Sequence, residues 1–327
     1  MTVPLVSIVV ATHRPRPDHL HAALRSALGQ TWTNLEVIVS DDSPTRAARD
    51  VAMAFSDTRL RYVKHDRALG AAGNHWWSFA AARGEWLAIL NHDDVFEAEF
   101  VASMMAPLLA ERNAALAFCD HWIVDVDGRR LLAESEGASR TWGRAGLAPG
   151  LHRPFLGLLA AQAVPMAMGT VFQRSLLPDA LPRTAGPAYD LWLTYLLARD
   201  GHGAIYVPRR LSSWRCHQGN LTSQAGADWI LGSVACWLAV ADDPRCQPIH
   251  RVARRRAAAG LSSLAARALA HGERADAQCH ARAALRAATS TRALAAWCVA
   301  HLPSACGRWI VSSRRSRARP LAAERRA

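Results

Sequence analysis

The chain has 327 residues, half of them apolar and a fifth charged, and its formal net charge is +12. This length and composition are typical of one large folded domain or two moderate ones, and they exclude a disordered chain. Residues 251–327 carry 16 arginines, no lysine and three acidic side chains, a net of +13, so residues 1–250 carry −1. The neutral body argues against nucleic-acid binding. It leaves the basic end to meet anionic lipid, an acidic partner or only solvent.

Seven cysteines are scattered without a CxxC pair, which disfavours a disulfide framework or a zinc cluster and fits a reducing compartment. The chain opens directly on the strand-like run "VPLVSIVVA", without a signal peptide's basic leader. Residues 155–172 are nearly uncharged, but Gln162 and Pro165 weaken them as a membrane span, so we expect a core helix followed by a buried strand. We therefore expect a cytoplasmic protein whose Arg-rich tail is a candidate for peripheral contact with the anionic inner face of a membrane.

The first 120 residues or so alternate short β-rich runs with helical patterns, which predicts a mostly parallel sheet covered by helices. The expected strands are residues 5–12, 35–40, 60–65 and 86–90. The expected helices are residues 18–28, 71–83 and 98–111.

The rest of the chain predicts a hairpin, a loop, a further strand, a helix and another strand, in that order. These elements are the hairpin turned at Asp127-Gly128, the loop 134–150, the strand 166–177, the helix 188–201 and the strand 204–208. From about residue 225 the pattern is helical, with a helical hairpin turned at His271-Gly272. We expect one α/β domain over residues 1–222, a helical extension over 223–303 and a loosely ordered tail over 304–327.

Three polar clusters follow predicted strands: "ATHRP" (11–15), "SDDS" (40–43) and "NHDD" (91–94). Ligands of open parallel sheets bind at the carboxyl ends of the strands, so we expect the clusters to converge. Gly70 and Gly73 at a helix start either favour an anion there or serve only packing, and the P-loop and dinucleotide fingerprints are absent.

Asp93 and Asp94 stand side by side after a buried strand, where like charges repel and dehydration is costly. A Mg²⁺ or Mn²⁺ would remove that penalty, because hard divalent ions take oxygen ligands and leave positions for phosphate oxygens. Taken alone, two adjacent aspartates are weak evidence, and Asp42 in "SDDS" could merely cap the next helix.

In combination, these motifs resemble the inverting family 2 glycosyltransferases of GT-A fold. The resemblance rests on "VSIVVATHRP", "QTW", "VSDDSP", "ALGAAGNHWW", "ARGEWLAILNHDD" and the late "YVPRRLSSWRCHQGN". It is close over residues 5–125 and looser to about residue 222. It implies a Rossmann-like, mostly parallel sheet flanked by helices, with the C-terminal helices as an extension.

The resemblance implies a nucleotide-diphosphate-sugar donor, with a UDP- or dTDP-sugar favoured. The residues that would bind this donor are Ala11, Thr12, His13, Asp42, Asn74 and Asp93. Within this set, Asp42 matches the residue that hydrogen-bonds the base, and Asn74 matches a polar position facing the nucleotide-sugar. The family often has an arginine before that asparagine, and Gly73 stands there in this chain.

The resemblance also implies a divalent metal, Mn²⁺ or Mg²⁺, at the position of the family's DXD motif. Asp94 is the better candidate for direct ligation, with Asp93 beside it, and His217 matches a late histidine that can approach the metal or diphosphate. The motif reads N-H-D-D, with His92 where the first acid often stands. Ligation by one aspartate or by two is therefore left open.

An inverting transfer needs a carboxylate to deprotonate the acceptor hydroxyl. Asp190 opens an apolar helix after a Gly-Pro turn and matches the family's base position; the alternative is a first-turn acid favoured by the helix dipole. Met168, Gly169 and Thr170 match the strand that lines the acceptor side, although a buried sheet explains them equally well. Trp214, in a loop-like segment, is the candidate for stacking on a sugar, and we assign the other tryptophans to packing.

The leading hypothesis is a metal-dependent inverting glycosyltransferase that uses a saccharide or lipid-linked acceptor in the synthesis of cell-surface polysaccharide. A nucleotide-sugar-binding protein without catalysis is the alternative, since it would not need Asp190. A phosphohydrolase or receiver-type domain fits poorly, because those place key acids directly after the first strand, where Thr12, His13 and Arg14 stand.

Overall fold

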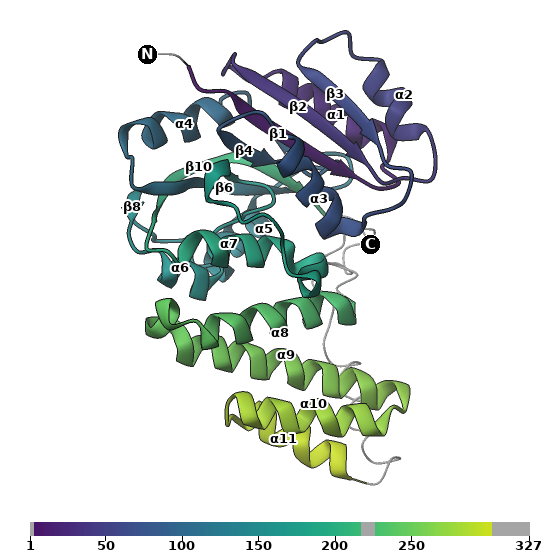
Figure 1. The fold of residues 1–327 in the computed structure, drawn as a ribbon, viewed down its shortest axis with the longest axis vertical. Helices are drawn as coiled ribbons and strands as arrows, with labels where there is room; N and C mark the ends of the chain where they lie inside the picture. The colour runs from purple at the N-terminus through teal and green to yellow at the C-terminus, as the bar shows by residue number, and fades with distance from the viewer. Residues whose placement is uncertain (1–2, 217–225, 303–327) are drawn as a thin grey trace. The chain divides into compact units, whose positions relative to one another are not determined.

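The computed structural model describes residues 3–216 and 226–302 and divides the chain into two compact units, Met1–Ala225 and Gly226–Ala327. Both contain the element types that the sequence predicts: a mixed α/β unit comes first and a helical unit follows (Figure 1). Among the described residues, no helix is both long and apolar enough to cross a membrane.

The first unit is built on one sheet with strand order β3-β2-β1-β4-β9-β6-β10-β5, with β7 beside β6 and β8 beside β10 (Figure 1). Strands β3, β2, β1 and β4 pair in parallel, as predicted, whereas β9 runs antiparallel between β4 and β6. The strands are β1 (Val6–Thr12), β2 (Leu35–Asp41), β3 (Leu60–Lys64), β4 (Trp86–Ile89), β5 (Val95–Phe96), β6 (Ala114–Val124), β7 (Arg130–Leu131), β8 (Gly150–His152), β9 (Thr170–Gln173) and β10 (Gly203–Arg215).

Helices cover both faces of this sheet. The main core lies on one face, where alternate residues of β1 (Val6, Ile8 and Val10) pack with apolar residues of α1, α2 and α4. Helix α3 contacts β1 and β2, and Asn74 on α3 bonds to both strands. The helices of this unit are α1 (Pro17–Leu28), α2 (Ala47–Met53), α3 (Gly70–Ala81), α4 (Phe100–Ala110), α5 (Leu132–Thr141), α6 (Leu156–Ala161) and α7 (Tyr189–Ala198).

The prediction of a loop over residues 134–150 was wrong for its first half, because α5 occupies Leu132–Thr141, and is confirmed for residues 142–149. The inner face of α5 is formed by Ser135 and Ser139, both buried, so the helix shows no apolar period. The Ser135 hydroxyl accepts a hydrogen bond from the backbone N–H of Ile123 and donates one to the carbonyl of Leu131. Serine hydroxyl groups therefore attach this helix to β6. Helix prediction from sequence relies on a period of apolar side chains, which this helix lacks.

Two strand boundaries also differ from expectation. The strand expected over residues 166–177 spans only Thr170–Gln173, and the strand expected over 204–208 continues as β10 to Arg215. The pairing of β10 with β6 shifts register between Val207 and Arg210, where Pro208 lacks an N–H for the ladder. Because of this irregularity, the second half of β10 could not be predicted as a strand from the sequence. The predicted segment 155–172 contains a buried helix, α6, before β9, as expected.

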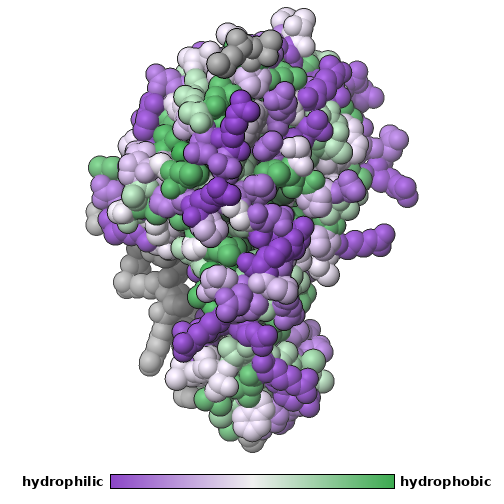
Figure 2. All heavy atoms as spheres, turned by 60° about the vertical axis from the view of Figure 1, so that its left-hand side comes forward, coloured by the Kyte–Doolittle hydropathy of each residue, from purple (hydrophilic) through white to green (hydrophobic). Residues whose placement is uncertain are grey.

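The second unit is helical: its described helices are α8 (Ala227–Asp242), α9 (His250–His271), α10 (Arg274–Ala287) and α11 (Thr291–His301). The predicted helical hairpin is present, since α9 ends at His271 and Gly272 follows in the left-handed conformation (φ 84°). On the face shown in Figure 2, hydrophilic and hydrophobic residues are interspersed, as on an ordinary protein surface.

Candidate active site

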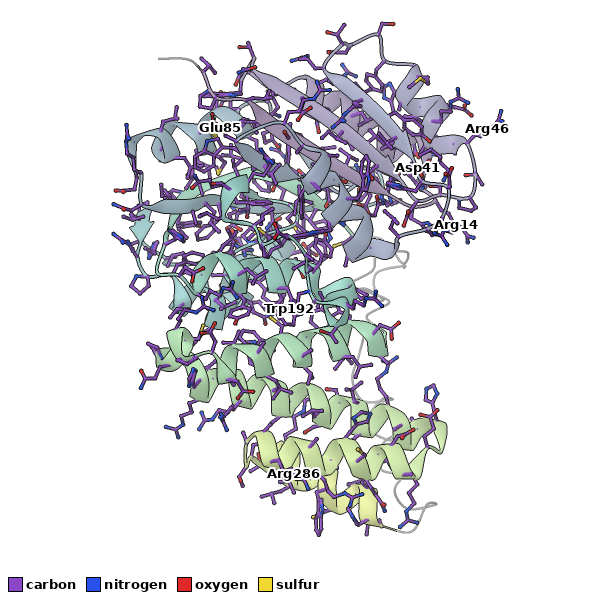
Figure 3. All side chains as sticks on the ribbon, viewed as in Figure 1. Arg14, Asp41, Arg46, Glu85, Trp192 and Arg286 are labelled. Atoms are coloured by element: carbon purple, nitrogen blue, oxygen red, sulfur yellow. The ribbon has the colours of Figure 1, made fainter. Side chains whose placement is uncertain are left out.

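The polar clusters converge at one edge of the sheet, as predicted. Thr12, the last residue of β1, lies opposite Asp41 at the end of β2, and β4 runs parallel on the other side of β1. Figure 3 labels Asp41 and Arg14 at this edge and Glu85, just before β4, at the opposite end. The backbone of Arg14 donates a 2.8 Å hydrogen bond to the hydroxyl of Ser43, which links the turn after β1 to the turn after β2.

Asp42 is buried and its carboxylate binds the start of α3. The backbone N–H of Leu69 donates to both carboxylate oxygens (2.9 and 2.8 Å), and that of Gly70 donates to Oδ2 (2.8 Å). His13 contacts the carbonyl of Asp42 through Nδ1 at 3.0 Å, so that nitrogen carries the proton. Asp42 therefore caps α3 rather than the next helix along the chain, α2, which has no side-chain cap. Its contact with a nucleotide base stays a prediction.

Asn74 is buried and its side-chain amide connects β1, β2 and α3. Its Nδ2 donates to the carbonyls of Thr12 and Ser40 at 3.2 and 3.0 Å, and its Oδ1 accepts from the Ser40 hydroxyl at 2.5 Å. These bonds engage both ends of the amide inside the protein. The contacts indicate that Asn74 positions the strand ends, rather than pointing its amide out of the fold toward a ligand.

Asp94 is fully buried behind Asp93, which is only half-buried. The Asp94 carboxylate accepts hydrogen bonds of 2.8 Å from the backbone N–H of Arg215 and from Nδ2 of Asn91. Burial, and then the charge of Asp93, raise the pKa of Asp94 well above its usual range, despite these bonds and the Arg215 charge. The like-charge conflict read from the sequence is therefore present in the structure.

Arg215 is a residue that the sequence analysis missed. It ends β10, is buried, and donates from Nε to the carbonyl of Asp93 at 2.8 Å. Its Nη1 also donates to the carbonyls of Asp125 and Val126, in the turn after β6. The sequence carried no clear signal for Arg215, because the segment 209–215 was not recognised as part of a strand.

Asp190 stands in the first turn of α7 and is half-buried; its Oδ1 accepts from the backbone N–H of Leu191 at 2.8 Å. Burial raises the pKa of Asp190 above its ordinary value. Its neighbour Tyr189 has a pKa raised by burial and also by the charges of Asp190, Asp94 and Asp93. The hydroxyl of Tyr189 thus lies within the electrostatic reach of all three carboxylates, so the expected base and the acidic pair share one region.

His75 on α3 contacts the start of α7. Its ring stacks on Tyr189 with centroids 4.1 Å apart, and its Nε2 lies 3.1 Å from the Tyr189 hydroxyl. Nδ1 donates to the carbonyl of Ala71 at 2.8 Å, so Nε2 accepts from the tyrosine and the ring is neutral. Burial lowers the pKa of His75 to about 4. Neither residue was identified from the sequence, where they read as ordinary helix positions.

The candidates for the acceptor side lie mostly in packed positions. Met168 and Gly169 belong to a turn before β9, and the buried hydroxyl of Thr170 donates to the carbonyl of Pro165 at 3.1 Å. Trp214 lies within β10 and meets the ring of His121 edge-on at 6.2 Å, so its placement in a loop was wrong.

His217 lies outside the described residues. Within them, no group of three or more His, Cys, Asp or Glu side chains is arranged to hold a metal ion. Mg²⁺ is often bound by one or two carboxylates with substrate phosphates completing the shell. Two adjacent carboxylates, one of them buried, are compatible with an ion of that kind.

Comparison with known proteins shows which family and which fold the chain resembles. The sequence model of glycosyl transferase family 2 matches residues 7–153. The UDP-Glc:alpha-D-GlcNAc-diphosphoundecaprenol beta-1,3-glucosyltransferase WfaP of Escherichia coli is 37% identical over 90 residues, which is 28% of this chain and 36% of WfaP. The succinoglycan biosynthesis protein ExoO of Rhizobium meliloti is 34% identical over 134 residues, 41% of this chain and 38% of ExoO. The chain thus matches little more than a third of the length of each of these relatives.

Solved structures agree on the fold at low sequence identity. S. aureus TarS 1–349 in complex with UDP-GlcNAc superposes with a TM-score of 0.66 at 14% identity, covering 95% of this chain and 91% of that one. The mannosyltransferase PcManGT from Pyrobaculum calidifontis, in complex with GDP-Man and Mn²⁺, has a TM-score of 0.56 at 16% identity and covers 95% of this chain and 85% of its own. Residues 7–153 of the chain are thus similar to glycosyl transferase family 2, and the fold is of the GT-A type.

Proposed function

We propose that this protein is a metal-dependent inverting glycosyltransferase that takes a sugar from a nucleotide-diphosphate donor, with a UDP- or dTDP-sugar favoured. The observation that carries the proposal is the cluster of polar groups at the carboxyl ends of β1, β2 and β4, which the contact of His75 with Tyr189 joins to the start of α7 and Asp190. Besides burial, the charges of Asp190, Asp94 and Asp93 raise the pKa of Tyr189, and these acids come from segments about a hundred residues apart. A transferase needs a base and a site for a diphosphate close together, and this cluster could supply both.

Asp93 and Asp94 are the residues that would hold a divalent ion, Mn²⁺ or Mg²⁺. An ion bound there supplies positive charge that stabilises the leaving diphosphate. The donor set fits such an ion, because a buried carboxylate beside a second one has an electrostatic cost that a cation offsets. His217 is retained as a third candidate ligand on the family resemblance alone.

Asp190 would accept the proton of the acceptor hydroxyl as that oxygen attacks the anomeric carbon. A pKa raised by burial suits a general base, because it brings proton affinity closer to neutral pH. Ala11, Thr12, His13 and Asp42 would line the nucleotide at the ends of β1 and β2. Asn74 would act through these strands by holding their ends in place.

Met168, Gly169, Thr170 and Trp214 remain the proposed acceptor side. The acceptor would be a saccharide or a lipid-linked glycan in polysaccharide synthesis. The WfaP relative is named for a lipid-diphosphate acceptor and ExoO for succinoglycan biosynthesis, which supports this class.

The net charge of +13 in residues 251–327 supports a cytoplasmic protein that touches an anionic membrane peripherally. Partition onto anionic vesicles that weakens with salt, and that is lost on removing residues 304–327, would test this contact. Equal partition with and without the tail would contradict it.

The proposal is tested with a panel of nucleotide-sugars, each added with and without Mn²⁺, using the melting temperature of the full chain as readout. We expect one nucleotide class to raise the melting temperature only with the ion, and slow hydrolysis of the matching donor by the wild type. The Asp94→Asn variant should lose the ion-dependent part of the shift. No stabilisation by any donor would contradict the proposal, whereas stabilisation with neither transfer nor hydrolysis would favour a non-catalytic binding protein.

A further inference from the structure

A polar pocket of about 290 Å³ lies in the first unit beside β6 and β10. None of its lining residues belongs to the candidate active site. Its polar walls come from α5, the turn after it and the two strands, and include two acids (Asp120 and Glu136), three arginines (Arg140, Arg144 and Arg210), Ser139 and Tyr206. Three arginines around one small pocket raise the question of what balances their charge.

The charge of Arg144 is balanced inside the protein. Its Nε donates to Oδ1 of Asp120 at 2.9 Å, and both side chains are buried. Its Nη1 donates to the carbonyl of Ala163. Burial acts to raise the pKa of Asp120, but the Ser139 hydroxyl and the charge of Arg144 outweigh it, so this pKa lies below its ordinary value. Asp120 and Arg144 therefore form a neutral pair at the floor.

Arg140 stands at the rim and is paired only loosely. It lies 3.8 Å from the carboxylate of Glu136, one helical turn earlier on α5, and both side chains are largely exposed. Exposed pairs of this kind hold each other weakly, so Arg140 can turn toward a ligand in the pocket.

Arg210 is the third arginine, and among the described residues no carboxylate forms an ion pair with it. Its Nη2 contacts the Ser139 hydroxyl at 3.3 Å, and its guanidinium lies 5.0 Å from the ring centre of Trp122. Its Nε is buried and has no hydrogen-bond partner there. The register shift in β10 between Val207 and Arg210 sets this side chain at the pocket, as irregularities in strands often do near binding sites.

We propose that this pocket binds an oxyanion, a phosphate or carboxylate group, held by the guanidinium of Arg210. A planar guanidinium with unused N–H groups matches the paired oxygens of such anions. The hydroxyl of Tyr206 supplies a further donor at the wall, and Arg140 closes the rim. The Ser139 hydroxyl donates to Asp120 and accepts from Arg210, so it positions these two side chains. The anion is either a free phosphate or the charged group of a larger molecule. The inference does not depend on the proposed transferase activity.

The test follows the side-chain Nε–H signal of Arg210 by NMR in the full chain, assigned by its absence in Arg210→Gln. Inorganic phosphate, pyrophosphate and acetate are titrated separately at constant ionic strength. We expect a saturable shift of this signal with at least one of the anions. Arg140→Glu, which reverses an exposed charge at the rim, should raise the dissociation constant about tenfold.

Two control variants separate a specific site from general screening. Arg112→Glu makes the same charge change at an exposed position away from the pocket, and Arg209→Gln removes the neighbouring arginine, which pairs with Glu99. Both should leave the dissociation constant within about twofold of the wild-type value. A linear shift without saturation, or equal weakening by Arg112→Glu and Arg140→Glu, would overturn the proposal.

The two sources of the anion give different results in turnover. If the anion belongs to an acceptor, Arg210→Gln raises the acceptor KM and leaves kcat unchanged. If the anion is a free phosphate, the same variant keeps that KM and loses only the response to added phosphate. The binding test needs no turnover, so its failure is distinguishable from failure of the proposed function.

Discussion

The carboxylate of Asp94 accepts a 2.8 Å hydrogen bond from the backbone N–H of Arg215, a residue 121 positions later in the chain. The side chain of Arg215 then reaches back to the carbonyl of Asp93. The end of β10 therefore holds the acidic pair from behind and leaves half-buried Asp93 in front. The acidic pair thus has a permanent positive neighbour in the protein, in addition to the ion that we propose.

Arg215→Ala should destabilise the first unit and misplace the acidic pair. It removes the bond to Asp93 and two further bonds to the carbonyls of Asp125 and Val126, and it leaves these acceptors without their donor. We expect a loss of about 2–4 kcal/mol in the free energy of unfolding, measured by urea denaturation. Arg209→Ala, an exposed neighbour on the same strand, should cost no more than about 0.5 kcal/mol. Equal losses in the two variants would contradict the structural role of Arg215.

Asp42→Ala tests the contact between the turn after β2 and α3. Because it removes the acceptor for the N–H groups of Leu69 and Gly70, we expect a loss of about 1–2 kcal/mol in the free energy of unfolding. Asp50→Ala is the control, an exposed acid in the first turn of α2. If Asp42 also binds a base, the variant weakens nucleotide binding in calorimetry by more than the control does. A variant as stable as the wild type would contradict the capping role.

The sequence could predict the parallel half of the sheet because three of its four strands, β1, β2 and β4, are largely apolar runs followed by polar residues. β1 and β2 are buried along their whole length apart from Glu36, and their last residues, Thr12 and Asp41, begin the polar turns. The convergence of "ATHRP", "SDDS" and "NHDD" followed from topology alone. Asp94 could likewise be singled out, since a charge directly after a buried strand needs a partner.

The features of the fold and of the site that the sequence did not predict depend mainly on contacts between residues far apart in the chain. The role of Arg215 depends on a turn 90 residues earlier, at Asp125, and His75 meets Tyr189 114 residues later. Helix α5 is attached by serine hydroxyls, which carry no periodic signal. Such pairs are visible only when the elements are placed in space.

His75 makes stability sensitive to acid. Its pKa is about 4 in the folded protein because of burial, against about 6.5 in an unfolded chain. As the pH falls from about 6.5 to about 4, the unfolded state takes up a proton that the folded state does not, so the free energy of unfolding falls by up to about 1.4 kcal/mol per pH unit. His75→Gln should reduce this slope, measured by urea denaturation between pH 7 and 4. His271→Gln, at an exposed position, should keep the wild-type slope; identical slopes in all three proteins would contradict the assignment.

Asp190→Asn should abolish transfer while keeping donor binding. General-base catalysis contributes about 10²–10⁴-fold, so kcat should fall by that factor with little change in the nucleotide-dependent melting shift. Because burial raises the pKa of Asp190, the wild-type kcat/KM should fall as the pH is lowered through a value above that of an ordinary aspartate, since only the carboxylate accepts the proton.

Asp228→Asn is the matched control for Asp190, because it changes the same residue type in the first turn of another helix, α8. If Asp190 served only the helix dipole, the two variants would each lose about 0.3–1 kcal/mol of stability and neither would lose activity. If Asp190 is catalytic, the Asp190→Asn variant instead loses turnover with little loss of stability. The acid limb of the pH profile of the enzyme then disappears in this variant. Since Asp228 shares the residue type and the helix position of Asp190, a difference in turnover between the two variants is attributable to a role of Asp190 beyond the helix dipole.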